Sequence, residues 1–216
     1  YVSKEMRELD SQVREKGLIF LNELGVDPGI DHMSAMKLLD EIRAEGNEIT
    51  CFESFTGGLV APESDNNPWN YKFTWNPRNV VLAGQGGAVQ FKHNGQFKYI
   101  PYQRLFRRTE IIEIPEYGRF EGYANRDSLN YRKTYGLEGI PTIYRGTLRR
   151  VGFCRAWNIF VQMGMTDDSY TIEDCPNMTH RQFTNSFLAF NQNDSVELKL
   201  MHYMKLDQDS EIIDKL

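Results

Sequence analysis

The chain has 216 residues, 40% of them hydrophobic and 25% charged, and its formal net charge at pH 7 is -5. These values are typical of a globular protein that buries a substantial core. Lysine and arginine form no cluster suited to nucleic acid, and no apolar run has the length of a membrane span. The first ten residues lack a basic segment followed by an apolar one, so we expect no signal peptide. Neither a nucleic-acid partner nor a membrane partner is therefore expected.

Cysteine and histidine usage predicts neither a disulfide framework nor a metal site. The three cysteines, Cys51, Cys154 and Cys175, are an odd number and lie far apart in the sequence. The four histidines lack the spacing of metal ligands. Free thiols are typical of a reducing compartment, so we expect a cytoplasmic protein without a bound metal ion.

The first residues predict a helix followed directly by a strand. Ser3 can cap a helix that ends at Gly17. The apolar run LIFLNEL at 18–24 is predicted as a buried strand. Such a pair at the very start of a chain, with Tyr1 in place of a methionine, is typical of the middle of a fold, so we expect a fragment of a longer protein.

The next predicted elements flank a loop rich in proline and asparagine. Asp31 is the expected N-cap of a helix that continues to about Ala44. Alternation of apolar residues predicts a strand at 48–58. The proline- and asparagine-rich loop at 59–70 lies between ordered elements, and loops of this kind are more often functional than plain connectors. The remaining features of this region are that loop at 59–70, a short predicted strand at 71–75 and a helical turn at 77–84.

The middle of the chain alternates like β-strands, and the remainder has helical spacing. Asn94-Gly95 between two alternating runs predicts a tight hairpin. Further strands are expected at 105–125 and 142–153, and apolar residues beyond them recur at helical spacing. We therefore expect an α+β fold with a mixed, largely antiparallel sheet, flanking helices and a helical C-terminal region.

Three motifs common in enzymes do not occur in the sequence. There is no Gly-x-Gly-x-x-Gly, and the nearest run, GQGGA at 84–88, lacks its spacing and a preceding buried strand. Neither a Gly-x-x-x-x-Gly-Lys-Ser/Thr phosphate loop nor a Gly-x-Ser-x-Gly nucleophile elbow is present. We therefore expect no dinucleotide-binding domain here, and we divide the chain into an α+β region at 1–150 and a mainly helical region at 151–216.

Two polar residues at predicted strand ends are candidate site residues. Asp27 lies between a predicted strand and a helix, where backbone N–H groups often face ligands, although an Asx turn would also explain it. Arg126 ends a predicted strand between Asn125 and Asp127. The alternative for Arg126 is a local surface pair with Asp127.

A third candidate is the face of a predicted strand. Alternation places Arg145, Thr147 and Arg149 on the same side of it. Because arginine binds carboxylates through two parallel hydrogen bonds, such a face suits a ligand with several carboxylates. A solvated outer sheet face is the alternative of equal weight.

Four stretches of the chain share long motifs with one enzyme family. They are, in chain order, GVDPGIDHMSAMKLLDEI, FTGGLVAPESDNNPWNYKFTWNPRNVVLAG, YANRDSLNY and RGTLRRVGF. Together they resemble the glutamate-forming saccharopine dehydrogenase family from residue 25 to about 153. The resemblance implies the substrate-binding and dimerisation region of an NAD- or NADP-dependent oxidoreductase, with an N-terminal dinucleotide-binding domain that lies outside this chain.

The resemblance also implies roles for particular residues. Asp27 would contact the substrate and is a candidate general base, with a base from the dinucleotide-binding domain as an equal alternative, while Asp31 would only cap its helix. Thr56 and Arg150 depart from the family pattern, which leaves substrate preference open. The implied substrate-binding residues are Asp27, Trp75, Arg126, Thr147, Leu148 and Arg149, and the implied cofactor-binding residues are Val26, Asp27, Pro28 and Asn76.

The reaction that the resemblance implies is the NAD(P)-dependent oxidation of saccharopine to L-glutamate and 2-aminoadipate 6-semialdehyde, or its reverse. Hydride leaves only from a neutral amine, so a general base is required. We expect a homodimer, and we expect the 216 residues alone to be inactive. Two alternatives stay open: a carboxyspermidine-type dehydrogenase acting on a polyamine adduct, and a binding or dimerisation module without catalysis.

Overall fold

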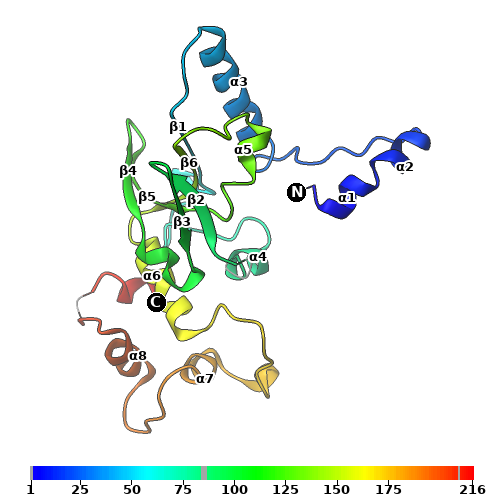
Figure 1. Cartoon of the computed structure of the whole chain (residues 1–216). Coiled ribbons are helices and arrows are strands. Elements are labelled where there is room, and N and C mark those ends of the chain that lie inside the picture. Colours follow the sequence, from blue (N-terminus) through cyan, green and yellow to red (C-terminus); the bar gives the residue numbers. More distant parts are fainter. Residues whose placement is uncertain (1, 84–86, 209) are drawn as a thin grey trace.

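A mixed, mostly antiparallel sheet lies at the centre of the molecule. The computed structural model describes residues 2–83, 87–208 and 210–216. The strands of these ranges are β1 (Cys51–Thr56), β2 (Val89–His93), β3 (Gln96–Ile100), β4 (Glu110–Ile114), β5 (Gly118–Ala124) and β6 (Thr142–Arg150). They form one sheet in the order β3-β2-β6-β5-β4, and β1 pairs in parallel with β6 (Figure 1). This arrangement confirms the predicted α+β class.

The helices of the described ranges differ widely in length. The α-helices of the described ranges are α1 (Lys4–Glu8), α2 (Asp10–Glu15), α3 (Ile30–Ala44), α4 (Pro77–Val81), α5 (Tyr131–Thr134), α6 (Phe153–Met163), α7 (His180–Asn185) and α8 (Val196–Met204). Short 3-10 helices are η1 (Pro62–Ser64), η2 (Tyr102–Arg107), η3 (Cys175–Asn177) and η4 (Ile213–Lys215). The helical character predicted beyond the sheet is confirmed.

The turn between β2 and β3 forms as the Asn94-Gly95 pair predicts. Both residues have positive φ angles, 47° and 79°, as the central residues of a type I′ turn require. Val89 pairs with Ile100 at the other end of the hairpin, and both side chains are buried. The open end of the hairpin therefore contributes apolar side chains to the core.

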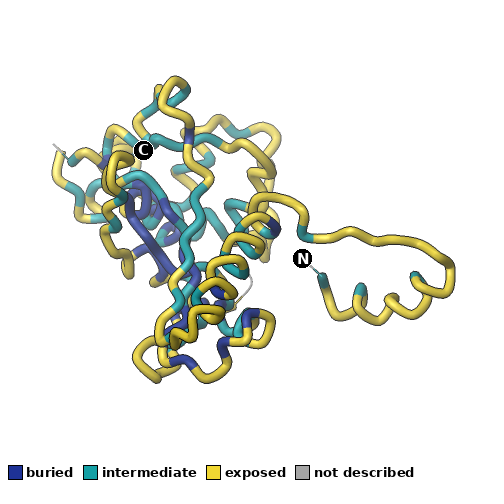
Figure 2. Tube along the Cα trace, turned by 90° about the horizontal axis from the view of Figure 1, so that it is seen from above, coloured by how far each residue is buried: buried dark blue, intermediate teal, exposed yellow. Residues whose placement is uncertain are grey.

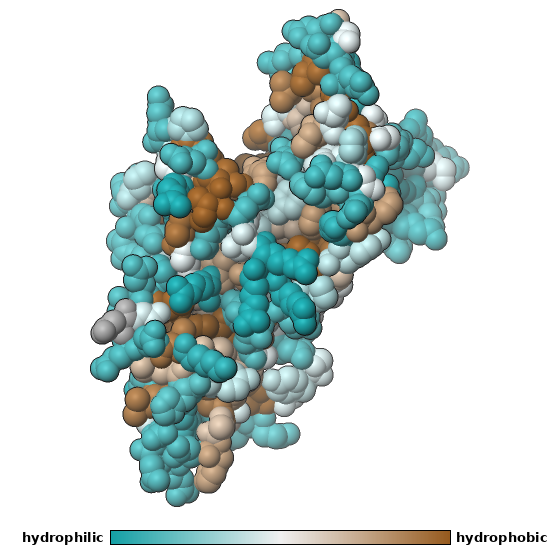
Figure 3. All heavy atoms as spheres, turned by 60° about the vertical axis from the view of Figure 1, so that its left-hand side comes forward, coloured by the Kyte–Doolittle hydropathy of each residue, from teal (hydrophilic) through white to brown (hydrophobic). Residues whose placement is uncertain are grey.

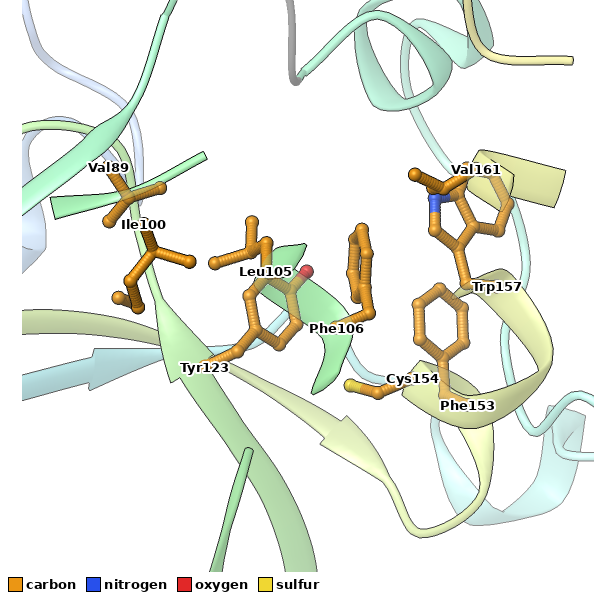
Figure 4. Packing of buried hydrophobic residues seen from close by; sticks show 10 residues of the cluster. Val89, Ile100, Leu105, Phe106, Tyr123, Phe153, Cys154, Trp157 and Val161 are labelled. Atoms are coloured by element: carbon orange, nitrogen blue, oxygen red, sulfur yellow. The ribbon is translucent and has the colours of Figure 1, made fainter. Parts of the chain in front are cut away.

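Helix α6 packs against the sheet and forms the largest core cluster with it. Phe153, Trp157 and Val161 recur at helical spacing and lie on one face of the helix. Figure 4 shows them facing Tyr123 of β5, with Phe106 of η2 between the helix and the strand. Aromatic side chains of this cluster, Phe106, Tyr123, Phe153 and Trp157, also line the cavity described below.

A buried glutamate of the sheet caps the start of α6. Glu121 of β5 is 8% exposed, and its two carboxylate oxygens accept the N–H groups of Gly152 at 2.9 Å and Cys154 at 2.8 Å. These N–H groups have no partner inside the helix, so a carboxylate is a favourable acceptor there. Glu121 thus fixes the direction in which α6 leaves the sheet.

A second core cluster joins α3 to the beginning of β6. Leu39 of α3 packs with Tyr135, Leu137 and Ile143, all of them buried. At the far end of α3, Arg43 donates from Nη2 to the carbonyl oxygen of Tyr135 at 2.6 Å. These contacts hold α3 in place over the segment that precedes β6.

The first residues of the chain differ from the prediction. The expected helix at 3–17 is two short helices, α1 and α2, although Ser3 does cap α1. The expected buried strand at 18–24 is wrong, because this segment pairs with no strand in the described ranges and Ile19 is 80% exposed. Figures 1 and 2 show it as part of an exposed arm that leaves the sheet. An apolar run becomes a buried strand only when a neighbour supplies its backbone hydrogen bonds.

The expected short strand at 71–75 is also wrong. Within this run, Tyr71 packs onto α6 instead, with its ring 5.1 Å from that of Phe153, whereas Phe73 and Trp75 are exposed; Trp69, just before the run, also contacts Phe153 at 5.7 Å. The helical turn predicted after this loop is confirmed as α4. Of the GQGGA run, residues 84–86 lie outside the described residues.

Strand β6 ends at Arg150 and α6 begins at Phe153, while the division into regions 1–150 and 151–216 stays a prediction. The core is continuous across that point, because α6 shares one cluster with β2, β3 and β5. Figure 3 shows a mostly hydrophilic surface with apolar side chains in separate patches. In the described part of the chain, no helix combines the length and the apolar character needed to cross a bilayer.

Candidate active site

The residues before α3 form a tight turn that carries Asp27. The N–H of Gly25 donates to the carbonyl oxygen of Pro28 at 3.0 Å, and the Asp27–Pro28 peptide bond is cis. Gly29 is the N-cap of α3, and a Cβ atom at that position would lie 2.1 Å from the carbonyl oxygen of Gly25. Only glycine fits there. The turn therefore fixes the backbone of Asp27 at the start of the helix.

One guanidinium contacts the carboxylate of Asp27 in this turn and that of Asp31 at the start of α3. Arg145 of β6 is 6% exposed, and its Nη2 lies 2.7 Å from Asp31 Oδ2 and 3.6 Å from Asp27 Oδ1. The side chain of Asp31 is 7% exposed, whereas that of Asp27 is 22% exposed. Asp31 is therefore the buried partner of Arg145, and Asp27 is the carboxylate that lines the cavity.

The role of Asp31 differs from the expected helix cap. Gly29 occupies the N-cap position, and Asp31 lies in the first turn of α3. Asp31 Oδ1 accepts the N–H of Gly29 at 2.7 Å, while Oδ2 accepts a hydrogen bond from Arg145. The predicted N-cap assignment is wrong, because Gly29 occupies the N-cap and Asp31 also pairs with Arg145, which lies 114 residues away in the sequence, where local patterns do not show it.

The loop that carries Arg126 is held by backbone hydrogen bonds on both sides. The carbonyl oxygen of Arg126 accepts the N–H of Gln90 at 2.9 Å, and the N–H of Asn125 donates to the carbonyl oxygen of Arg145 in β6 at 2.8 Å. Arg126 has a φ angle of 43°, a conformation that costs energy for a residue with a side chain. The carboxylate of Asp127 accepts the N–H of Leu129 at 2.8 Å, so it serves the loop itself.

Arg149 lies between aromatic rings. Its guanidinium carbon is 4.9 Å from the ring centre of Tyr71 and 5.2 Å from that of Phe153. Its Nη1 donates to the carbonyl oxygen of Leu148, while its Nε is buried and has no hydrogen-bond partner among the described residues. A buried N–H without a partner costs free energy, which a bound anion would recover.

These segments line one cavity of about 540 Å³. That volume is in the range of small-molecule sites, roughly 300–1,000 Å³. Guanidinium groups next to apolar rings suit a ligand that carries carboxylates. The charged residues of its described lining are Asp27, Arg126, Asp127 and Arg149, and the aromatic ones are Tyr71, Trp75, Tyr102, Phe106, Tyr123, Phe153 and Trp157.

Most of the substrate-binding residues predicted from the sequence meet in this cavity. The lining contains Asp27, Trp75, Arg126, Thr147 and Arg149. Leu148 is outside it and packs against Gly57 instead. Of the two departures from the family pattern, Thr56 lines the cavity, whereas Arg150 lies outside the lining and over the ring of Phe120 at 4.9 Å.

The predicted cofactor-binding residues other than Asp27 lie beside the cavity lining. Asn76 caps α4, because its side chain accepts the N–H of Asn79 at 3.3 Å. Val26 is 66% exposed and adjoins Asp27 in the turn. Pro28 is half-buried on the other side of Asp27, where its carbonyl oxygen closes the turn.

Burial keeps the phenol groups of the cavity protonated. It raises the pKa of Tyr123 to about 12 and also raises the pKa values of Tyr71 and Tyr102. Such phenols donate hydrogen bonds at neutral pH but accept no proton. Asp27 and Asp127 are the carboxylates of the described lining. Asp127 Oδ1 accepts a backbone N–H of its own loop, whereas Asp27 Oδ1 lies 3.6 Å from the guanidinium of Arg145.

Sequence reasoning missed the residues that surround the Arg145 pair. Arg145 was expected on a ligand-binding face, but its guanidinium lies over the ring of Tyr131 at 4.1 Å and pairs with the α3 turn. His32 Nδ1 lies 2.5 Å from the hydroxyl of Tyr135, and its ring stacks on Tyr131 at 5.1 Å. No local pattern joins these residues, since the contacts bridge α3, α5 and β6.

Fold and cavity together define an α+β ligand-binding domain with carboxylate and guanidinium groups in an aromatic pocket. The family model of the saccharopine dehydrogenase C-terminal domain matches residues 25–213. The NADP+-dependent, L-glutamate-forming saccharopine dehydrogenase of Schizosaccharomyces pombe is 38% identical and aligns with 85% of this chain and 41% of its own length. The mitochondrial alpha-aminoadipic semialdehyde synthase of Rattus norvegicus is 34% identical over 97% of this chain and 23% of its own length.

A solved structure shows the same fold. The apo saccharopine dehydrogenase (L-Glu forming) of Saccharomyces cerevisiae superposes with a TM-score of 0.82 and 30% identity, over 100% of this chain and 49% of that one. The chain therefore belongs to the saccharopine dehydrogenase C-terminal domain family. It spans less than half the length of these relatives.

In the described ranges, no group of three or more His, Cys, Asp or Glu residues is arranged to hold a metal ion.

Proposed function

We propose that this chain forms the substrate-binding part of a whole protein that oxidises saccharopine with a nicotinamide cofactor, or forms saccharopine in the reverse direction. The observation that carries the proposal is the cavity in which Asp27, Arg126 and Arg149 meet, within a domain of this family. The relatives from two yeasts are named as NADP+-dependent, L-glutamate-forming saccharopine dehydrogenases.

Recognition of the substrate rests on charge. Saccharopine joins a lysine side-chain nitrogen to a glutarate skeleton and carries three carboxylates. Arg126 is exposed and Arg149 is half-buried between aromatic rings, so they can bind carboxylates at different depths of the cavity. Thr147, between Arg145 and Arg149 on β6, adds a hydroxyl to the same wall. A carboxyspermidine-type substrate, with fewer carboxylates, would use these arginines less.

In this proposal the chain has two chemical tasks: it accepts a proton from the substrate and it orients the substrate. Asp27 accepts the proton of the substrate ammonium, directly or through water, and leaves the neutral amine from which hydride departs. The carbon–nitrogen bond on the lysine side then becomes an imine. Addition of water to that imine and cleavage of the carbon–nitrogen bond release glutamate and 2-aminoadipate 6-semialdehyde. Saccharopine, water and oxidised cofactor are consumed, and reduced cofactor and one proton are formed in addition.

A nicotinamide cofactor fits beside the cavity. Val26 and Trp75 expose 66% and 61% of their surface, and Trp75 belongs to the cavity lining. Apolar surface of this kind suits a flat nicotinamide ring, with Pro28 and the amide of Asn76 as further contacts. The bound cofactor would supply the hydride acceptor, and the dinucleotide-binding domain of the whole protein would hold its phosphates.

Assembly and location stay predictions. A homodimer of the whole protein is expected, and size-exclusion chromatography with light scattering measures it. The rat relative carries the word mitochondrial in its name, so a cytoplasmic location has to be tested by fluorescence microscopy of the tagged protein.

The experiment that tests the proposed function is a substrate assay of the whole protein. We expect saccharopine to drive the reduction of NADP+ or NAD+, measured by the absorbance of the reduced nicotinamide, with glutamate identified by mass spectrometry. Carboxyspermidine serves as the competing substrate and should react far more slowly. A folded whole protein that reduces neither cofactor with saccharopine would refute the proposal.

A further inference from the structure

Arg145 joins three segments of the site through its backbone and its side chain. Its N–H donates to Ser128 Oγ at 2.9 Å, and its carbonyl oxygen accepts the N–H of Asn125 at 2.8 Å. Both ends of the loop that carries Arg126 are therefore tied to a single residue of β6. Ser128 is 0% exposed, so this attachment is buried.

The side chain of Arg145 extends from the same residue to the turn before α3. Its Nη2 donates to Asp31 Oδ2 at 2.7 Å and lies 3.6 Å from Asp27 Oδ1. The face of the guanidinium is covered by the ring of Tyr131 at 4.1 Å, which limits its freedom to rotate. A short contact to Asp31 and a longer one to Asp27 leave Asp27 able to accept a further hydrogen bond.

The cluster of Asp27, Asp31 and Arg145 has more carboxylates than guanidinium groups, and this excess of negative charge favours a cation in the cavity. Two carboxylates share one guanidinium, and both sit in a partly buried environment where charges interact strongly. His32 is the other titratable neighbour, with Nδ1 3.9 Å from Asp31 Oδ2. Tyr135 stays a neutral phenol, because burial raises its pKa to about 12. A substrate ammonium at Asp27 would balance the remaining negative charge.

We infer that Arg145 is a positioning residue for Asp27: anchored by Asp31, its guanidinium sets where the Asp27 carboxylate stands relative to the loop of Arg126. This inference rests on the proposed function. It assigns Arg145 a role distinct from that of Arg149, although the alternation of β6 places both residues on the same face of the strand. It also assigns Asp31, which does not line the cavity, an effect on turnover that acts through Asp27.

A double-mutant cycle in the whole enzyme tests this role, with Arg145→Met, Asp27→Asn and the double variant. We expect Arg145→Met to lower kcat/KM for saccharopine by about 100-fold, while the KM for the cofactor stays nearly constant. In the Asp27→Asn background the same change should cost less than about 3-fold, because the group that Arg145 positions has lost its charge. Losses that multiply independently would show that Arg145 acts elsewhere.

A second variant keeps the test decisive if Arg145→Met does not fold. Asp31→Asn is nearly isosteric, and its amide oxygen can still accept the N–H of Gly29. It loses the charge that anchors Arg145, so we expect kcat/KM for saccharopine to fall by about 10-fold, again only when Asp27 is intact. Parent-like kinetics of a folded Asp31→Asn enzyme would overturn the inference.

Arg43→Met is the matched control, because Arg43 also ties α3 to a neighbouring segment but at the opposite end of the helix. It should lower the thermal unfolding temperature and leave kcat/KM unchanged. The saccharopine turnover of the unmutated enzyme distinguishes a failure of the proposed function from a failure of the positioning role of Arg145. A parent without saccharopine turnover would refute the proposed function and this inference with it. A parent with turnover, whose variants lose activity independently, would refute the positioning role alone.

Discussion

Asp27 lies in the turn before α3 and Asp31 in the first turn of that helix, and they share one guanidinium, yet their surroundings give them different roles. Asp31 is almost fully covered and binds both Arg145 and the backbone N–H of Gly29. Asp27 is more exposed, stands farther from Arg145 and lines the cavity. The sequence places both carboxylates beside a helix start but cannot rank them, because the ranking depends on a strand more than a hundred residues later.

Asp27→Asn should separate chemistry from architecture. The amide keeps an oxygen of similar shape in the turn, so the whole enzyme should lose only about 1 kcal/mol of unfolding free energy. If Asp27 accepts the amine proton, kcat should fall by roughly 100-fold or more. Steady-state kinetics across pH, with urea unfolding as the control for folding, give both quantities. A folded variant with parent kinetics at every pH would make Asp27 a turn residue only.

Arg126→Ala should weaken substrate binding without affecting the cofactor. A substrate carboxylate left without its arginine partner costs about 2–4 kcal/mol, so the KM for saccharopine should rise steeply. Arg150→Ala is the matched control, because Arg150 lies on the neighbouring strand, over Phe120 and outside the cavity lining. An unchanged KM for saccharopine in Arg126→Ala would favour the alternative for Arg126, a local surface pair with Asp127.

At the scale of elements, local chemistry predicts well where it decides the structure. Asn94-Gly95 specifies its turn because both residues accept positive φ angles, and the apolar spacing from Phe153 specifies the buried face of α6. The runs at 18–24 and 71–75 fail as strands, because a strand is defined by its neighbour. In the second run, Tyr71 packs on a helix rather than in a sheet.

The cap of α6 gives a prediction at this scale. Glu121→Ala removes the acceptors of two backbone N–H groups at the helix start, so the unfolding free energy should fall by about 2–3 kcal/mol. Chemical denaturation with two spectroscopic probes measures this loss. Glu113→Ala on the exposed side of β4 is the control and should change stability by less than about 0.5 kcal/mol. Equal stabilities of the two variants would contradict the capping role.

At the scale of the whole molecule, the candidate site is assembled from distant parts of the chain. The turn of Asp27, the loop of Trp75, the loop of Arg126 and strand β6 meet in one cavity. Family resemblance predicts most of these residues, but neither it nor local pattern reveals that Arg145 joins them. Those contacts depend on the antiparallel pairing of β5 with β6 and on the packing of α3 against β6.

The 216 residues alone should bind no nicotinamide cofactor tightly and should produce no reduced cofactor from saccharopine. A dinucleotide site holds the pyrophosphate at a glycine-rich turn between a strand and a helix. The sequence has no Gly-x-Gly-x-x-Gly, and β1–β6 is the one parallel strand pair within the described ranges. Circular dichroism and cooperative unfolding establish that the isolated chain is folded, so that inactivity has a defined cause. The whole protein, assayed in parallel, should reduce the cofactor. Turnover by the pure, folded chain would show that cofactor binding does not depend on a separate dinucleotide-binding domain.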